Sequence, residues 1–246
     1  MSFKDRSRII FGDANLTRLE DTTICVAGLG GVGAAAAMDL VRCGVGRLAV
    51  IDFDAVQESN LNRLYFGYLD TVGLAKTAAF AAYARRVNPA IKVIEYSGLL
   101  RGAQIGDILP ADCDYYLDCI DTLNSKVNLI GELVRHHYPF TSSMGTAGRL
   151  RPERLQVGSL WQVHHCSLAA KVRSRLRRLG IGEADAITCV WSDEPAVAPA
   201  APEDGSIPGT IAGLGRVRAV QGSAPFVPQA AGHILASLAV RAMLES

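Results

Sequence analysis

The sequence predicts an α/β fold in which helices cover both faces of a mostly parallel sheet. Short apolar segments recur from residue 23 to residue 142 and alternate with segments of helical periodicity. The first apolar segment runs directly into the glycine-rich turn Gly28-Leu29-Gly30-Gly31-Val32-Gly33. Strands that alternate with helices through short turns favour right-handed crossovers, and hence a parallel sheet of Rossmann-like type.

The first two strand and helix pairs are the clearest. We expect a strand at residues 23–27, where an apolar run ends at the glycines, and an alanine-rich helix at residues 32–42. A second strand at 47–53 and a second helix at 74–87 repeat the unit. That helix stops before Pro89, because the residue preceding a proline is disfavoured in helical conformation.

The following segments continue this alternation. Strands are expected at residues 92–96, 115–119 and 139–142, with a helix at residues 124–136 between the last two. Ligands of such sheets bind beyond the carboxyl ends of the strands. The glycine turn, Asp52 and Asp121 all lie at expected strand ends, so the sequence places a site at that edge.

After Gly148 the elements become shorter and less regular. Strands at 155–160 and 187–191, a helix at 167–179 and a closing helix from residue 227 are expected there. The segment 195–222 is rich in Pro, Gly and Ala and predicts a mobile loop or crossover.

Chain length is compatible with one large domain. The chain has 246 residues, and we expect a single domain over 1–246. Its core would span 8–148, and a C-terminal extension over 149–246 would pack on the same domain on the substrate side.

The overall composition excludes some classes of protein. The chain has 25 Lys and Arg against 24 Asp and Glu, so no global field draws it to nucleic acid or to an anionic membrane. The charged start of the chain lacks a signal-peptide pattern, which predicts a cytoplasmic protein. Residues 224–244 are apolar but interrupted by Pro225, Pro228 and Arg241, which predicts a docked helix and no membrane span.

The six cysteines include no Cys-x-x-Cys pair, so a four-thiolate zinc site is not expected. Cys25 and Cys119 lie in apolar runs and are interpreted as core residues. Cys166 and Cys189 are open to either a structural or a chemical role, because a reactive thiol needs a lowered pKa that the sequence does not reveal.

The glycine turn predicts a nucleotide site. Its four glycines, Gly28, Gly30, Gly31 and Gly33, match the GxGxxG pattern, in which backbone amides and a helix N-terminus approach phosphate. Asp52, after the second strand, is placed to hold ribose hydroxyls. These features do not distinguish ATP from NAD.

A polar series after the glycine turn favours ATP. It consists of Asp52, Asp54, Asn60, Arg63, Lys76 and Asp121. Arg63 and Lys76 supply positive charge for an α-phosphate and a departing pyrophosphate, and Asp121 is a candidate ligand of Mg²⁺ or of its water. The series therefore predicts adenylyl transfer. Asp54, together with Asn62 and Lys126, is the weaker part and is equally open to a structural role.

Four motifs together resemble the adenylating domain of the ubiquitin-activating-like (ThiF-type) superfamily, which includes activators of bacterial sulfur carriers. They are GLGGVG, DFD-x5-NLNR, GLAK and DCID, within residues 8–145. The resemblance implies that Asp52 binds ribose, that Asn60, Arg63 and Lys76 bind phosphates, and that Asp121 binds magnesium. It also implies that Arg8 reaches the ATP site of a partner subunit, which makes the protein a homodimer.

The second half is similar to the tRNA threonylcarbamoyladenosine dehydratase branch of that superfamily. Residues 143–152, 167–173 and 189–195 carry the similarity, and the branch likewise lacks zinc-binding cysteines. It implies ATP-dependent cyclisation of a modified adenosine in tRNA. Residues 159–167 depart from the branch, with His165-Cys166-Ser167 where Asp-Pro is expected.

Two other functions therefore stay open. One is an adenylyltransferase acting on the C-terminal Gly-Gly of a ubiquitin-like sulfur carrier within a sulfur relay. The other is a non-catalytic partner protein that binds nucleotide.

A cluster of basic residues suits tRNA binding, and equally a solvated surface. Its members are Lys171, Arg173, Arg175, Arg177 and Arg178, with Arg149, Arg151 and Arg154 nearby.

Overall fold

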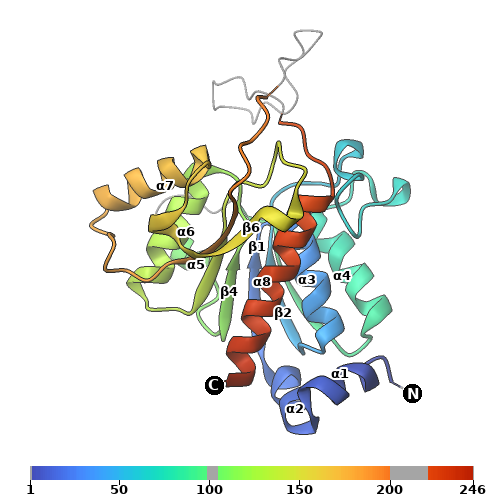
Figure 1. Ribbon diagram of the computed structural model, residues 1–246. Coiled ribbons are helices and arrows are strands. Elements are labelled where there is room, and N and C mark those ends of the chain that lie inside the picture. The colour runs from blue at the N-terminus through green and yellow to red at the C-terminus, as the bar shows by residue number, and fades with distance from the viewer. Residues whose placement is uncertain (1, 99–104, 200–220, 246) are drawn as a thin grey trace.

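The computed structural model describes residues 2–98, 105–199 and 221–245, and its centre is one seven-stranded sheet (Figure 1). The strand order is β3-β2-β1-β4-β5-β7-β6. The strands are β1 (Thr23–Ala27), β2 (Arg47–Ile51), β3 (Lys92–Tyr96), β4 (Tyr115–Asp118), β5 (Phe140–Ser143), β6 (Leu155–Ser159) and β7 (Thr188–Ser192). β6 runs antiparallel to β7, and the other neighbouring pairs are parallel. The predicted α/β class is confirmed.

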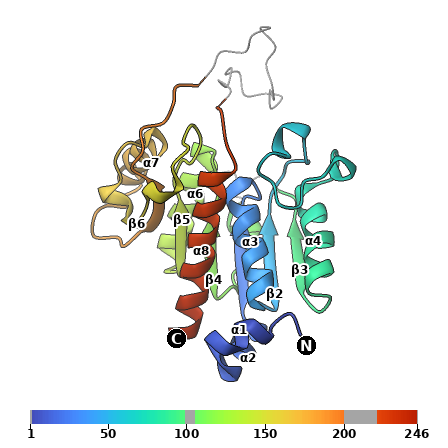
Figure 2. The ribbon, with the colours of Figure 1, turned by 45° about the vertical axis from the view of Figure 1, so that its right-hand side comes forward.

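Helices cover both faces of this sheet. They are α1 (Asp5–Phe11), α2 (Asp13–Asp21), α3 (Gly31–Cys43), α4 (Lys76–Val87), α5 (Ile105–Ile108), α6 (Leu123–Arg135), α7 (Ser167–Arg178) and α8 (Phe226–Glu245). Figures 1 and 2 show α3, α4 and α8 on one face and α5, α6 and α7 on the other. The sequence did not predict α1 and α2, because α1 buries no residue and α2 buries only Leu16 and Leu19.

One closely packed helix pair joins segments that lie far apart in the sequence. The C-terminal helix α8 lies along α3, as both views show. A Cβ on Gly232 of α8 would come within 2.4 Å of the Val32 carbonyl oxygen, so this approach needs glycine. Alanines 34–37 of α3 are fully buried and keep its surface flat. Close packing of the two backbones thereby fixes the first turn of α8 beside the glycine-rich turn.

The strand order creates one position suited to a ligand. The chain builds β1, β2 and β3 outward in one direction and then returns to place β4 on the other side of β1. The connections after β1 and β4 therefore diverge at their carboxyl ends, which is where ligands of such sheets bind. The glycine turn follows β1, and the turn carrying Asp121 follows β4.

The C-terminal extension completes the same sheet with β6 and β7. Of the predicted loop 195–222, residues 200–220 lie outside the described residues. Its two described flanks meet at Gly148: the Val197 N–H donates to the Gly148 carbonyl at 2.8 Å, and the Gly148 N–H donates to the Gly222 carbonyl at 2.8 Å. In the described parts of the chain, no helix is both long and apolar enough to cross a membrane.

The six cysteines are free thiols. Cys25 is buried in the core as predicted, and Cys119 is half-buried against the core cluster on α3. Cys189 is fully buried, and burial raises the pKa of its thiol to about 12. The Cys166 sulfur accepts a hydrogen bond from the Ala169 N–H at 3.4 Å and so caps α7. The surroundings of Cys166 and Cys189 therefore indicate a structural role for both thiols.

Candidate functional site

Two glycines of the turn, Gly28 and Gly33, are packed tightly against neighbouring backbone. Gly28 has φ of 90°, and a Cβ there would lie 2.9 Å from the Cys119 carbonyl oxygen. A Cβ on Gly33 would meet the Gly28 carbonyl oxygen at 1.8 Å. Both positions thus require glycine, because the turn lies between β4 and the start of α3.

The other two glycines lie on the outer side of the turn. Gly30 caps the N-terminus of α3, and a Cβ there would meet nothing within 4 Å. A Cβ on Gly31 would lie 3.1 Å from Cγ of Arg63. The turn is therefore open at Gly30, where the helix N-terminus can receive an anion, and covered by an arginine at Gly31.

Asp52 is bonded directly to the glycine turn. Its Oδ2 accepts a hydrogen bond from the Leu29 N–H at 2.6 Å, and its Oδ1 accepts one from the Asp54 N–H at 2.8 Å. Its side chain is 7% exposed. Burial raises the pKa of Asp52, while the positive charge of Lys76 and these two hydrogen bonds oppose the shift. The carboxylate is thus held in one orientation at the carboxyl end of β2.

Lys76 occupies the same corner of the site. Its Nζ lies 2.9 Å from Oδ2 of Asp54 and 3.7 Å from Oδ1 of Asp52. The lysine side chain is 9% exposed, whereas that of Asp54 is 50% exposed. The backbone N–H of Lys76 also donates to the Asp54 carbonyl at 3.0 Å, which fixes the first turn of α4. A buried ammonium beside a half-exposed carboxylate can exchange that partner for a phosphate oxygen.

Arg63 covers the glycine turn at Gly31, and Asp121 is near enough to act on the charge of Arg63. Burial lowers the pKa of the Arg63 guanidinium, and the negative charge of Asp121 opposes that shift. Arg63 Nη1 donates to the Ser59 carbonyl at 2.8 Å and to Asn62 Oδ1 at 2.9 Å. Gln229 of α8 donates to the Arg63 carbonyl at 3.4 Å, a contact that sequence patterns did not indicate. Asp121 itself is exposed.

Asn60 differs from the rest of the series. It ends the short 3₁₀ helix η1 (Glu58–Asn60), and its Oδ1 accepts a hydrogen bond from the Gln57 N–H at 3.3 Å. Its carbonyl accepts hydrogen bonds from the Arg63 and Leu64 N–H groups. Here Asn60 stabilises the turn that presents Arg63 through these local hydrogen bonds.

A fully buried ion pair lies behind Asp121. Lys126 Nζ lies 2.6 Å from Oδ2 of Asp118, and both side chains are 0% exposed. Ser142 of β5 donates to the same Asp118 oxygen at 2.6 Å. Oδ1 of Asp118 accepts from the Ile120 N–H at 3.1 Å. The sequence left Lys126 between a structural and a site role, and Asp118 was missed; together they fix the turn that carries Asp121.

The structure separates the basic residues into two groups. Arg149 is buried and donates to the carbonyls of Gly145, Ala147, His165 and Glu194. Arg154 pairs with Asp193 at 2.6 Å. Arg149 therefore serves the fold, which corrects its interpretation as a surface or RNA-binding cation, whereas Arg154 belongs to a partly exposed ion pair.

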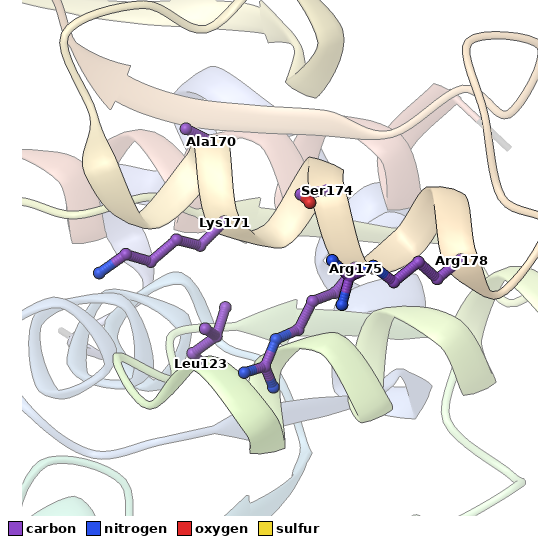
Figure 3. Close-up of a pocket in the computed structure, with 6 residues that line it drawn as sticks. All are labelled: Leu123, Ala170, Lys171, Ser174, Arg175 and Arg178. Carbon is purple, nitrogen blue, oxygen red and sulfur yellow. The ribbon is translucent and has the colours of Figure 1, made fainter. Parts of the chain in front are cut away.

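On α7, too, some basic residues have partners within the fold and others line an open surface, and the two kinds lie on different faces of the helix. Arg173 donates to the Leu160 and Val163 carbonyls, and Arg177 pairs with Glu183 at 3.3 Å. The remaining three, Lys171, Arg175 and Arg178, are exposed and line a groove beside α6 (Figure 3). Arg151 is also exposed.

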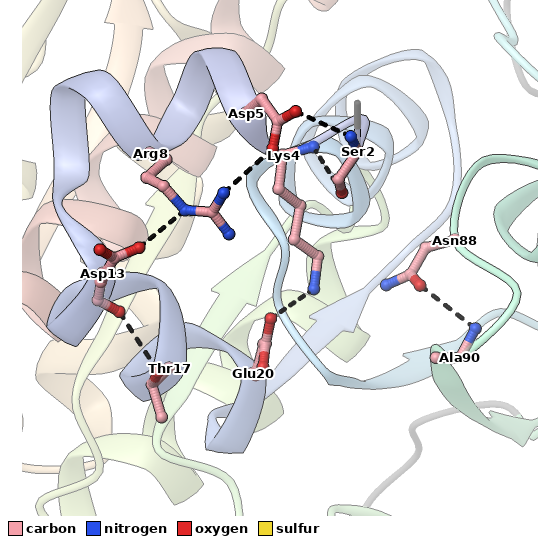
Figure 4. Close-up of polar contacts among 9 residues, drawn as sticks. All are labelled: Ser2, Lys4, Asp5, Arg8, Asp13, Thr17, Glu20, Asn88 and Ala90. Carbon is pink, nitrogen blue, oxygen red and sulfur yellow. Dashed lines mark hydrogen bonds and ion pairs between the residues drawn. The ribbon is translucent and has the colours of Figure 1, made fainter.

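Arg8 lies far along the fold from the glycine turn of its own chain. It is on α1, where it pairs with Asp5 at 3.0 Å and with Asp13 at 2.7 Å (Figure 4). The next helix, α2, leads into the amino end of β1, whereas the glycine turn follows the carboxyl end of that strand. The structure therefore places Arg8 at the opposite edge of the sheet.

The chain matches one protein family and shows full-length similarity to characterised relatives. The ThiF family matches residues 5–174. The tRNA threonylcarbamoyladenosine dehydratase of Bacillus subtilis (strain 168) is 30% identical over 98% of this chain and 94% of its own length. The protein of that name from Escherichia coli (strain K12) is 31% identical over 96% of this chain and 91% of its own length.

Solved structures agree with these sequence matches. The crystal structure of the Escherichia coli tRNA N6-threonylcarbamoyladenosine dehydratase, TcdA, in complex with AMP has a TM-score of 0.86 to this chain at 30% identity. The same protein in complex with ATP has a TM-score of 0.86 at 29% identity. Each match covers 98% of this chain and 93% of the other. By its sequence, its sheet and its glycine turn, the chain belongs to the ThiF family.

Proposed function

We propose that this chain is an ATP-dependent enzyme that adenylates and cyclises threonylcarbamoyladenosine in tRNA, with loss of water. The observation that carries the proposal is the fixed corner of Asp52 and Lys76 beside the glycine turn, with Asp52 bonded to the Leu29 N–H. A hydride-transfer site needs no buried ammonium there. Full-length similarity to the Bacillus subtilis and Escherichia coli dehydratases supports the substrate.

Each polar residue has a role in this proposal. The N–H groups at Gly30, Gly31 and Gly33 bind phosphate oxygens, and Asp52 binds the ribose hydroxyls. Gly28 shapes the turn, because its own N–H donates to the Ile51 carbonyl at 2.8 Å. Lys76 leaves Asp54 and, with Arg63, binds the phosphates that gain charge as pyrophosphate departs. Asn60 reaches a phosphate by releasing its local hydrogen bond to the Gln57 N–H.

The proposed chemistry needs no nucleophile from the protein. The threonyl carboxylate attacks the α-phosphorus of ATP, a P–O bond forms, and pyrophosphate leaves. The neighbouring carbamoyl group then attacks the activated carbonyl carbon and expels AMP, which carries away one carboxylate oxygen, while one proton is released. Proximity within one substrate lowers this barrier, and such effects are worth up to about 7 to 11 kcal/mol. The protein supplies orientation and fixed positive charge.

Mg²⁺ fits the site as an ion shared with the nucleotide. Within the described residues, no group of three or more His, Cys, Asp or Glu side chains forms a metal site. Mg²⁺ usually binds through one or two carboxylates together with substrate phosphates, and the exposed Asp121 carboxylate suits that arrangement. Bound there, the ion would neutralise charge on the phosphates.

A homodimer would bring Arg8 to a site that it does not reach within its own chain. The same helix α1 exposes two large apolar side chains, Ile9 at 80% and Ile10 at 81%. Adjacent exposed apolar side chains of this size favour burial against a partner. In the proposed dimer Arg8 leaves Asp5 and Asp13 and contacts nucleotide bound by the partner subunit. We further propose that the enzyme acts in the cytoplasm, where its tRNA substrate is found.

Residues 159–167 give a specific reason to test a second acceptor. His164 and His165 are exposed next to the cap of α7, and His165 has φ of 51°. This is where the chain departs from the dehydratase pattern. Adenylation of the C-terminal Gly-Gly of a ubiquitin-like sulfur carrier is therefore the alternative, with the same ATP chemistry.

The deciding experiment compares acceptors directly. Exchange of labelled pyrophosphate into ATP should be stimulated by tRNA carrying threonylcarbamoyladenosine, and mass spectrometry should find the cyclised nucleoside and AMP in equal amounts. If only a carrier ending in Gly-Gly stimulates the exchange, that carrier replaces tRNA as the proposed substrate. Binding of ATP without exchange for either acceptor would instead favour a non-catalytic partner protein.

A further inference from the structure

The groove between α6 and α7 is a concentrated patch of positive charge outside the nucleotide site. It has a volume of about 470 Å³ and is lined by Leu123, Ala170, Lys171, Ser174, Arg175 and Arg178 (Figure 3). We call it the α7 groove. We propose that it binds consecutive phosphates of a single-stranded RNA segment next to the nucleotide that is modified. The inference rests on the proposed function and specifies how its substrate is held.

Helical spacing aligns the three cations. Lys171, Arg175 and Arg178 are separated by four and three residues, so they share one face of α7. Figure 3 shows all three side chains on the side of α7 that faces α6. From Lys171 to Arg178 the helix rises about 10 Å. A row of three charges of this length matches a short extended run of nucleotides rather than a single anion.

The groove has positive charge that the fold does not neutralise. None of the residues that line it is acidic. Arg175 Nη1 donates to Oδ1 of Asn124, a neutral acceptor on α6, which holds the guanidinium over the groove. The cations on other faces of α7 are already engaged, Arg177 with Glu183 and Arg173 with two backbone carbonyls. The charges that line the α7 groove thus differ from those on the other faces of α7, which have partners within the fold.

The position of the groove connects it to the reaction. Leu123, the first residue of α6, lines the groove and follows Asp121 by two positions along the chain. An RNA segment lying in the α7 groove therefore reaches the turn that carries Asp121. The apolar surface of Leu123 and Ala170 beside the charges suits the faces of bases or ribose. Because the whole chain carries a formal net charge of +1, attraction of RNA depends on such a local patch.

The test replaces the three charges in the full chain. In the variant Lys171→Gln/Arg175→Gln/Arg178→Gln, we expect the Kd and KM for tRNA carrying threonylcarbamoyladenosine to rise about tenfold or more at low salt. The slope of log Kd against log salt should fall in magnitude by about 2, since each single-strand phosphate contact contributes about 0.7. The kcat at saturating tRNA and the KM for ATP should stay at the wild-type values.

A matched control removes the same charge elsewhere. Lys92 at the start of β3, Arg135 at the end of α6 and Arg241 near the end of α8 are exposed, so Lys92→Gln/Arg135→Gln/Arg241→Gln should keep the wild-type Kd and salt slope. The single variants Lys171→Gln and Arg178→Gln should each reduce the slope by about 0.7. These single changes keep the test valid if the triple variant folds poorly.

The outcomes separate this proposal from the proposed function. An unchanged Kd and salt slope in the triple variant overturns the RNA groove. A raised KM for ATP in that variant would assign the cations to nucleotide binding and would also overturn the proposal. Displacement of tRNA by polyglutamate, but not by a single-stranded oligonucleotide, would assign the cations to an acidic protein and would overturn it too. If the wild-type chain binds such an oligonucleotide with the expected slope but never cyclises tRNA, the groove stands and the proposed function fails.

Discussion

Lys126 Nζ and Asp118 Oδ2 lie 2.6 Å apart in a fully buried ion pair at the carboxyl end of β4. The pair joins α6 to β4, and Ser142 extends it to β5. Removing one partner leaves the other charge buried without compensation. A buried pair is therefore costly to break even where its net contribution to folding is small.

Lys126→Met should lower the free energy of unfolding by about 3 to 5 kcal/mol, because Asp118 is left as an isolated buried carboxylate. Denaturant titration of the purified protein measures this loss. The double variant Asp118→Leu/Lys126→Met should recover part of it, since both charges are then absent. Equal destabilisation by the single and the double variant would contradict an interaction between the two residues.

Lys76→Ala and Arg63→Ala should each reduce kcat by two to three orders of magnitude, because each removes a positioned donor worth about 3 to 4 kcal/mol in the transition state. Pyrophosphate exchange and cyclised-nucleoside formation measure the effect. Arg85→Ala provides the control, since Arg85 is an exposed cation near the other end of α4. Near-normal turnover in both site variants would remove the proposed assignment of charge to the phosphates.

The sequence located this corner of the site because the glycine turn and Asp52 follow expected strands, and Lys76 lies at the start of an expected helix. In a parallel sheet such boundaries meet at one edge. Asp118–Lys126 was not predicted, since an acid inside a strand and a lysine on a helix carry no local sign that they pair. Arg149 was misassigned for a related reason: its four backbone carbonyl partners come from separate loops. Helix α1 was missed because it buries nothing.

Asp52→Asn should weaken ATP binding, and its stability relative to the wild type should depend on pH. Burial raises the pKa of Asp52, so ionisation of the folded protein costs more than that of the unfolded chain. The stability that this carboxyl contributes is present at acid pH and is lost as pH rises through the raised pKa. The free energy of unfolding of Asp52→Asn should therefore decrease relative to that of the wild type as pH falls. Thermal melts at pH 4 to 8 test this, and a relative stability of the variant that rises toward acid would refute it.

Cys189 should behave as a core residue. Burial raises the pKa of its thiol to about 12, so at pH 8 only about one thiol in ten thousand is ionised, and the thiolate is the reactive form. Iodoacetamide should leave Cys189 unmodified in the folded protein, as read by peptide mass spectrometry. Cys189→Ala should retain cyclisation with wild-type kcat. Loss of turnover in this variant without loss of thermal stability would instead indicate a chemical role.

Arg8→Ala should abolish turnover through the partner's site. Mixing Arg8→Ala with Lys76→Ala under subunit exchange should restore about a quarter of wild-type activity, since half of the dimers are mixed and each has one complete site. The control Arg6→Ala changes a neighbouring exposed residue of α1 and should stay active alone. If Arg8 served its own chain, each mixed dimer would lack one residue at both sites. Activity that stays at the level of the separate variants, while native mass spectrometry detects mixed dimers, would therefore exclude a shared site.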